Sequence, residues 1–319
     1  MFRWFLLSHH TDVAEKEKWM ALTGKIIRKL PDGVGVIELV IGPYRNSRPV
    51  FLVDGVKVEL IQERTRKSFR ALHDVQKAVK YVRGQGLRVH GCVYSGHGGG
   101  VVFGPWSGRT QLCTVKEFND SVLRELRPRV FLADSCYFGN MASLYEFSSV
   151  KSLQYVLGSP SFHPSSSILQ TDAINQLTDG NVSRERLWAA MKRAVRQFHN
   201  RPGPPYVCLM LFSMDAIRKL PGILLRSPLS FGKHTMVHRD DHMLHDIYTA
   251  AKPGEVRSRL KDCVHGTRRD GRCVRIKSLT MYTEIPKEHK DAFIDTRWYK
   301  EMKRHAPLPW GGDFSIDFN

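Results

Sequence analysis

A histidine and a cysteine occupy comparable places in two segments, "VYSGHGGG" and "VFLADSCYFGN". Each comes after a short apolar run and is followed within three residues by a glycine, and His97 and Cys136 lie 39 residues apart (136 − 97). A cysteine thiolate can attack a carbonyl carbon, and an imidazole can protonate the amine that leaves. We therefore predict that Cys136 is a nucleophile and that His97 is its general acid.

Such chemistry also needs backbone N–H groups directed at the oxyanion that forms during attack. The glycines that follow His97 carry no side chain, so a substrate carbonyl can come close to their backbone. We expect the N–H groups of Gly98 and Cys136 to form the oxyanion hole. Taken alone, a cysteine at the end of a strand is more often a buried thiol, so the prediction depends on the histidine loop.

The elements that must position these residues alternate between strands and helices. Strands are predicted over 3–7, 33–42, 49–61, 87–96, 129–133, 153–160 and 204–213, and helices over 66–84, 114–126, 141–147, 168–177 and 183–199. Asp54-Gly55 indicates a hairpin turn, and Thr114 with Glu117 indicates a helix capping box. Strands separated by helices predict an α/β fold with a mostly parallel sheet covered on both faces. In such sheets chemistry gathers beyond the carboxyl ends of the strands, where both loops would lie.

The two loops resemble a known family. "VYSGHGGG" followed by "VFLADSCYFGNMASLYEF" is similar to the His-Gly and Asp-x-Cys motifs of the clostripain-like cysteine peptidases, relatives of caspases, gingipains, legumain and separase. The segments "YVLGSPSFHP" and "YVCLMLFSMDAIRKL" resemble later parts of the same family. The resemblance covers roughly residues 87–220. It implies a caspase-like three-layer α/β/α sandwich and a catalytic dyad of His97 and Cys136.

The resemblance also implies that Asp134 lines the S1 pocket and selects Arg or Lys at P1. A carboxylate binds a guanidinium through charge-assisted, often bidentate hydrogen bonds. In the loop "SPSFHPSSS", which lacks the additional acid often found in the family, Ser161 and His163 are candidate substrate-binding residues. Self-processing is implied as well, and Arg109 in "WSGRTQ" is the candidate cleavage site. The chemistry requires no cofactor, although the resemblance leaves room for a structural calcium ion.

The chain divides by composition near residue 225. We expect a caspase-like peptidase domain over 1–225 and a basic, His-rich extension of unassigned fold over 226–319. The formal net charge of +18 favours an acidic partner or nucleic acid besides a protein or peptide substrate. Two alternatives to an enzyme therefore stay open. One is an inactive caspase-like interaction module, and the other is a structural protein associated with nucleic acid or a virion.

A second cluster of candidate ligands lies in "HTMVHRDDHMLHDI". On a helix, His234, His238, His242 and His245 would share one face, and two histidines one turn apart can chelate zinc. The segment contains no H-E-x-x-H pattern. We therefore favour a solvated helix face and assign no metal site.

The cysteines and the apolar runs indicate a compartment. Six cysteines spread over 319 residues do not form a disulfide framework, which favours a reducing environment such as the cytoplasm or nucleus. The start "MFRWFLLSHHTD" is read as a buried strand rather than a signal peptide, and we expect no transmembrane segment.

Overall fold

The structure is a computed structural model of the chain. It describes residues 1–10, 13–28, 30, 32–42, 49–59, 71–104, 112–161, 182–199, 208–238, 241–269, 276–285 and 287–318. Within them, a nine-stranded central sheet has the order β14-β10-β9-β8-β5-β1-β2-β3-β4. Its strands are β1 (Phe2–His9), β2 (Val34–Ile41), β3 (Val50–Val53), β4 (Val56–Lys57), β5 (Gly91–Ser95), β8 (Val130–Asp134), β9 (Tyr155–Gly158), β10 (Cys208–Ser213) and β14 (Val264–Arg269).

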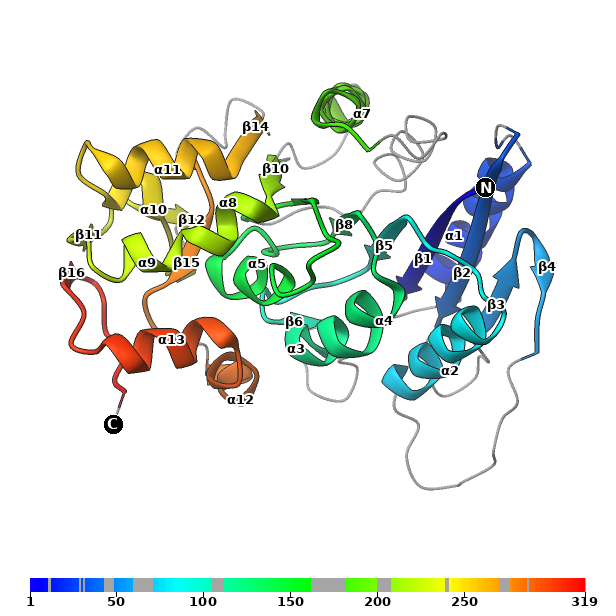
Figure 1. The fold of residues 1–319 in the computed structure, drawn as a ribbon, viewed down its shortest axis with the longest axis horizontal. Coiled ribbons are helices and arrows are strands. Elements are labelled where there is room, and N and C mark those ends of the chain that lie inside the picture. Colours follow the sequence, from blue (N-terminus) through cyan, green and yellow to red (C-terminus); the bar gives the residue numbers. More distant parts are fainter. Residues whose placement is uncertain are drawn as a thin grey trace.

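The centre of this sheet is parallel and its edges are antiparallel. Strands β9, β8, β5, β1 and β2 run in one direction, each pairing in parallel with the next. Beyond them the pairing is antiparallel: β10 pairs with β9 and β14 with β10 at one edge, and β3 pairs with β2 and β4 with β3 at the other. The predicted α/β class with a mostly parallel sheet is confirmed, and Figure 1 shows the chain crossing the molecule from its N-terminal strands to its C-terminal helices.

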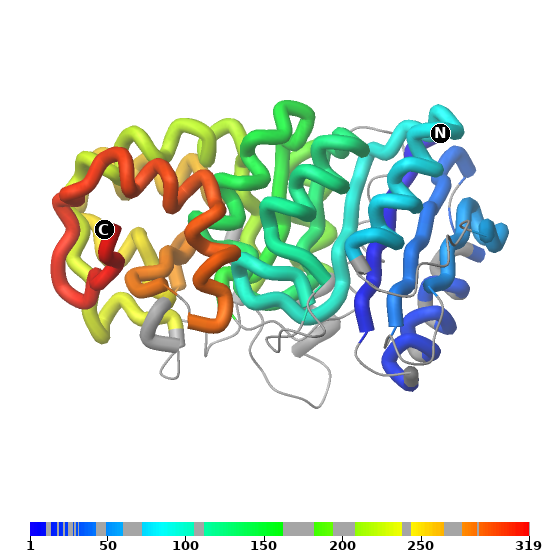
Figure 2. The backbone as a smooth tube through the Cα atoms, turned by 90° about the horizontal axis from the view of Figure 1, so that it is seen from below, coloured from blue at the N-terminus to red at the C-terminus, as the bar shows by residue number. Residues whose placement is uncertain are grey.

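Helices cover the sheet on both faces. Among the described residues before 226 they are α1 (Val13–Ile27), α2 (Ala71–Gly84), α3 (Val115–Phe118), the π-helix η1 (Asn119–Leu123), α4 (Arg124–Leu126), α5 (Met141–Phe147), α7 (Arg184–His199), α8 (Met214–Lys219) and α9 (Pro221–Leu224). Helices α1 and α2 lie on opposite sides of β1 and β2 (Figures 1 and 2). The sheet accordingly separates two apolar clusters, because alternate residues of each strand face opposite sides.

Two local signals read from the sequence correspond to observed structure. Asp54 and Gly55 join β3 to β4 with φ angles of 48° and 84°, as a two-residue hairpin turn requires. Thr114 caps α3 through the amide of Glu117, whose carboxylate accepts from the Thr114 amide in return. The predicted helix over 168–177 lies outside the described residues.

The segment after residue 225 folds against the rest of the chain. Its elements are β11 (Leu229–Phe231), β12 (Met236–His238), β13 (Asp241–Asp246), α10 (Ile247–Ala250), α11 (Glu255–Cys263), β14, β15 (Thr280–Tyr282), the 3-10 turn η2 (Lys287–His289), α12 (Lys290–Ile294), α13 (Arg297–His305) and β16 (Trp310–Gly312). Strand β14 extends the central sheet, and one apolar cluster contains residues from both parts of the chain. The boundary after residue 225 stays a prediction.

The expected helix across the four histidines is wrong. Strand β12 ends at His238, and β13 contains His242 and His245. His245 is buried, and its Nδ1 lies 2.6 Å from the Thr235 hydroxyl oxygen. The pairing of β13 with β15, about 35 residues further along the chain, outweighs the local helical spacing. Among the described residues, no group of three or more His, Cys, Asp or Glu side chains could hold a metal ion.

No helix of the described part of the chain combines the length and the apolar character needed to cross a membrane.

A buried carboxyl lies between β2 and α1. Glu38 is 1% exposed, and its Oε1 accepts a hydrogen bond of 3.0 Å from Trp19 Nε1. Burial raises the pKa of Glu38 to about 7 from its ordinary 4.5, although hydrogen bonds from Thr23 and Trp19 act in the opposite direction. The folded protein therefore keeps this proton at pH values where the unfolded chain has lost it.

This carboxyl makes the stability of the protein depend on pH. The free energy of unfolding should fall by ~3 kcal/mol on account of Glu38 as pH rises from about 4.5 to about 7, and then level off. Glu38→Gln should remove that dependence, so the variant should equal wild type near pH 4 and exceed it near pH 8. Urea denaturation across this range measures the difference. Glu17→Gln, at an exposed carboxyl of the same helix α1, serves as control, and a pH-independent difference between Glu38→Gln and wild type would contradict the assignment.

Candidate active site

The register of two neighbouring strands brings the predicted histidine and cysteine loops together. Strands β5 and β8 pair in parallel, with Ser95 opposite Asp134. His97 and Cys136 each follow this last pair by two residues, at the carboxyl edge of the sheet. The loops touch, since a Cβ placed on Gly98 would lie 3.0 Å from the Cys136 carbonyl oxygen. The side chain of His97 is exposed and that of Cys136 is half-buried.

The histidine loop is a tight hairpin with a fixed backbone. The carbonyl of His97 accepts hydrogen bonds from the Gly104 amide at 2.9 Å and from the Tyr94 hydroxyl at 2.8 Å. The Gly99 amide donates to the Val102 carbonyl at 3.0 Å. With this pattern, Gly98 faces Phe103 as a pair without direct hydrogen bonds. The N–H of Gly98 is thus directed away from Phe103.

The cysteine loop is fixed by the segment that follows β9. The Tyr137 amide donates to the Ser161 carbonyl at 2.9 Å, and the Gly139 amide donates to the Ser159 carbonyl at 2.8 Å. Tyr137 has a φ of 64°, a left-handed conformation that is rare for a bulky residue. The chain thus turns sharply directly after Cys136.

Asn140 connects the cysteine loop to the histidine loop. Its Oδ1 caps helix α5 by accepting from the Ser143 amide at 3.0 Å. Its Nδ2 donates to the Gly100 carbonyl at 3.2 Å and to the Tyr137 carbonyl at 2.6 Å, and the Ser143 hydroxyl also donates to Gly100. Sequence reasoning missed this role, although an asparagine just before an apolar helix is a recognisable N-cap signal.

The predicted substrate residues fall partly within the described structure. Asp134 is fully buried, and its Oδ2 accepts a hydrogen bond of 3.2 Å from the Ser95 hydroxyl. Ser161 is buried next to the cysteine loop, and its carbonyl accepts the hydrogen bond from the Tyr137 amide. The structure therefore brings His97, Cys136, Asp134 and Ser161 to one edge of the sheet. His163 and Arg109 lie outside the described residues.

Burial distinguishes Cys136 from the other described cysteines. Cys92, Cys113, Cys208 and Cys263 are buried, and all five described cysteines are free thiols. Burial raises the pKa of the Cys92 and Cys113 thiols well above the ordinary range and that of Cys263 to about 12. Reagents in solution therefore meet Cys136 more readily than these thiols.

A further histidine lies beside the histidine loop. His9, at the end of β1, is buried, and a Cβ on Gly96 would lie 2.7 Å from the His9 carbonyl oxygen. Burial, the largest cause, acts together with the charges of His10 and His97 to lower the pKa of His9 to about 4. His9 is therefore neutral at physiological pH and adds no charge next to His97.

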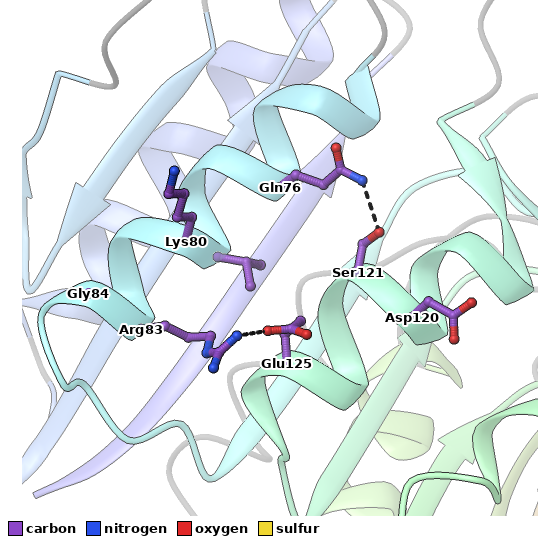
Figure 3. A pocket seen from close by; sticks show the side chains of 8 residues that line it. Gln76, Lys80, Arg83, Gly84, Asp120, Ser121 and Glu125 are labelled. Atoms are coloured by element: carbon purple, nitrogen blue, oxygen red, sulfur yellow. Dashed lines mark hydrogen bonds and ion pairs between the residues drawn. The ribbon is translucent and has the colours of Figure 1, made fainter.

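A large groove lies away from these loops. It has a volume of about 660 Å³ and runs between α2 and the helical stretch 115–126, with Arg83, Gly84 and Glu125 among its lining residues (Figure 3). The Arg83–Glu125 ion pair and a 3.1 Å hydrogen bond from Gln76 to Ser121 cross it. Since α2 ends at Gly84 before the chain enters β5, the Arg83 end of the groove lies toward the amino edge of the sheet.

The fold is similar to that of solved cysteine proteases. No protein-family model and no curated protein matches the sequence. The inactive zymogen of a C11 protease from Parabacteroides distasonis has a TM-score of 0.69 at 12% sequence identity, over 94% of this chain and 97% of that chain. A secreted C11 cysteine protease from Bacteroides thetaiotaomicron, solved with an irreversible peptide inhibitor, has a TM-score of 0.69 at 12% identity, over 95% of this chain and 99% of that chain.

The protein thus has the caspase-like fold of the C11, or clostripain-like, cysteine proteases. The resemblance recognised in the two loop motifs is confirmed at the level of the fold. Because the similarity covers 94% of the chain, it extends beyond residues 87–220 into the C-terminal segment.

The histidine loop should not tolerate a side chain at Gly100. This residue has a φ of 79°, and a Cβ there would overlap the hydroxyl of Tyr282. Gly100→Ala should lower the free energy of unfolding by roughly 2–4 kcal/mol, since it adds a steric clash to the cost of a left-handed alanine.

Gly86→Ala is the matched control for this substitution. Gly86 has a φ of 64°, and a Cβ there would meet no atom within 4 Å. This variant should lose only the ~1–2 kcal/mol of the left-handed backbone. Urea denaturation measures both losses, and equal losses would show that Tyr282 does not restrict Gly100.

Proposed function

We propose that the protein is a cysteine endopeptidase that uses His97 and Cys136 as a catalytic dyad. The observation that carries the proposal is their equivalent placement, two residues beyond the paired ends of β5 and β8, in a fold shared with C11 proteases. The partial exposure of Cys136 and the exposure of His97 support it, because both groups must meet a substrate. The inhibitor bound to the Bacteroides protein is a peptide, which supports a peptide substrate here.

The reaction proceeds through an acyl-enzyme. His97 takes the proton of the Cys136 thiol, the thiolate attacks the carbonyl carbon, and the new oxyanion accepts hydrogen bonds from the N–H groups of Gly98 and Cys136. As the C–N bond breaks, His97 donates a proton to the departing amine. Water, deprotonated by His97, then hydrolyses the thioester and releases the acid and the thiol. The N–H of Gly98, which is directed away from Phe103, supports its part in the oxyanion hole.

Asp134 selects a basic residue at P1. Its carboxylate lies at the last paired position of β8, two residues before the nucleophile, and the Ser95 hydroxyl orients it. A carboxylate buried this far is reached by the long side chains of Arg and Lys, and the pair gains strength away from water. Ser161 and His163, from the segment after β9, complete the substrate-binding loop.

The protein activates itself by cleavage after Arg109. This residue lies in the stretch between the histidine loop and the capping box at Thr114, so a break there leaves β5 and β8 intact. The C11 protease from Parabacteroides distasonis is described as an inactive zymogen, which supports a precursor form for this chain as well.

The chain acts in a reducing compartment. The five described cysteines are free thiols, as cytosolic and nuclear proteins maintain them. The net charge of +18 favours binding of an acidic partner or of nucleic acid. A protein without enzymatic activity would support that alternative function.

Fluorogenic peptides with Arg, Lys or Asp at P1 test the activity and its specificity together. Wild type should hydrolyse the Arg and Lys peptides and spare the Asp peptide. Cys136→Ala should lose at least 1000-fold in kcat/KM because it lacks the nucleophile. Asp134→Asn should lose about 10–100-fold on the basic peptides, since a neutral amide no longer pairs with the P1 cation.

Cys263→Ala, at a buried thiol remote from the two loops in sequence, is the matched control and should keep wild-type turnover. Turnover that survives in Cys136→Ala would exclude this cysteine as nucleophile. Silence of folded wild type toward all three peptides would favour the interaction module.

Intact-mass measurement tests the cleavage at Arg109. Wild type should yield two fragments whose masses correspond to cleavage of the 109–110 bond. Cys136→Ala and Arg109→Ala should each keep the mass of the intact chain. A single full-length mass for active wild type would show that no self-processing at this site is needed.

A further inference from the structure

Strand β15 of the C-terminal segment contacts all three loops at the carboxyl edge of the central sheet. Thr280 and Tyr282 are two residues apart on this strand, so their side chains share one face. Both are buried. Each makes hydrogen bonds to a different part of the candidate active site.

Tyr282 supports the histidine loop. Its hydroxyl donates to the Gly99 carbonyl at 3.0 Å, across 183 residues of sequence, and occupies the space next to Gly100. His289 adds a second contact, because a Cβ on Gly99 would lie 2.8 Å from its Nε2. The backbone that follows His97 is therefore held from the C-terminal side.

Thr280 supports the other two loops. Its amide donates to the Gly139 carbonyl at 3.0 Å, within the cysteine loop. Its hydroxyl donates to the Pro160 carbonyl at 3.3 Å, next to Ser161. Because Gly139 and Tyr137 donate in turn to Ser159 and Ser161, Thr280 holds the cysteine loop and the proposed substrate loop together.

Strand β15 is itself a fixed support. It pairs with β13, where Tyr282 lies opposite Leu244, and the Tyr282 ring packs edge-on against Phe293 with centroids 5.3 Å apart. The carboxylate of Asp246 accepts 2.8 Å hydrogen bonds from the amides of Lys277 and Ser278, directly before the strand begins. The contacts to the loops therefore come from a rigid element.

We propose that Tyr282 and Thr280 are positioning residues with separate tasks. Tyr282 keeps the histidine loop in the geometry needed for proton transfer and oxyanion binding, and Thr280 keeps the Pro160–Ser161 segment in the geometry needed for substrate binding. The kinetic part of this proposal rests on the proposed peptidase function. The structural part does not, since it concerns the order of two loops.

Hydrogen exchange of backbone amides tests the structural part. Tyr282→Phe removes only the hydroxyl, and exchange of the Gly99 and Val101 amides should become at least about tenfold faster. Thr280→Val removes only the side-chain donor, and exchange of the Tyr137 and Gly139 amides should rise instead. Tyr299→Phe is the matched control, because its ring packs on the same Phe293 with centroids 6.0 Å apart, and it should leave both loops unchanged.

Steady-state kinetics on the basic peptides test the assignment of tasks. Tyr282→Phe should lower kcat about tenfold at constant KM, and Thr280→Val should raise KM several-fold at constant kcat. Thr280→Ser keeps the donor and should restore the wild-type KM. If both variants changed kcat and KM to the same extent, the assignment of separate tasks to Tyr282 and Thr280 would be overturned.

The two proposals can fail independently. Altered exchange in wild-type-like folded variants, with no turnover by wild type, would refute the peptidase and leave the positioning role in place. Turnover by wild type, with Tyr282→Phe and Thr280→Val matching Tyr299→Phe in exchange and kinetics, would refute the positioning role alone.

Discussion

The parallel pairing of β5 with β8 is the constraint on which the candidate site depends. Its register places Ser95 beside Asp134 and thereby starts the histidine loop and the cysteine loop at the same edge. A shift by one residue would turn Asp134 to the opposite face of the sheet, because side chains alternate along a strand. Asn140 and Ser143 then join the loops through the Gly100 carbonyl, so the site is closed by hydrogen bonds as well as by strand order.

Local patterns predicted the parts of this fold that local physics determines. The turn at Asp54-Gly55 requires residues that accept positive φ, and the capping box at Thr114 is satisfied within four residues. Apolar runs separated by helical stripes likewise predicted the central strands. Once these strands were predicted, the tendency of functional loops to follow the carboxyl ends of parallel strands was enough to place His97 and Cys136 at one edge of the sheet.

Contacts between distant segments could not be read in the same way. The helical spacing of the four histidines after residue 233 was outweighed by pairing with β15, which nothing in that stretch encodes. The same holds for Tyr282, whose partner Gly99 is 183 residues away. The glycines after His97 were predicted to leave room for a substrate carbonyl, and only the fold identified the C-terminal side chains that lie against Gly99 and Gly100.

The position of β15 late in the chain has a consequence for biosynthesis. Domains fold as their residues leave the ribosome, and the strands that carry His97 and Cys136 emerge long before residue 280. The nascent chain can therefore pair β5 with β8 while Gly99, Gly139 and Pro160 still lack their C-terminal partners. The loops that carry His97 and Cys136 thus reach their final arrangement only after residues 280–282 have been synthesised and have docked against them.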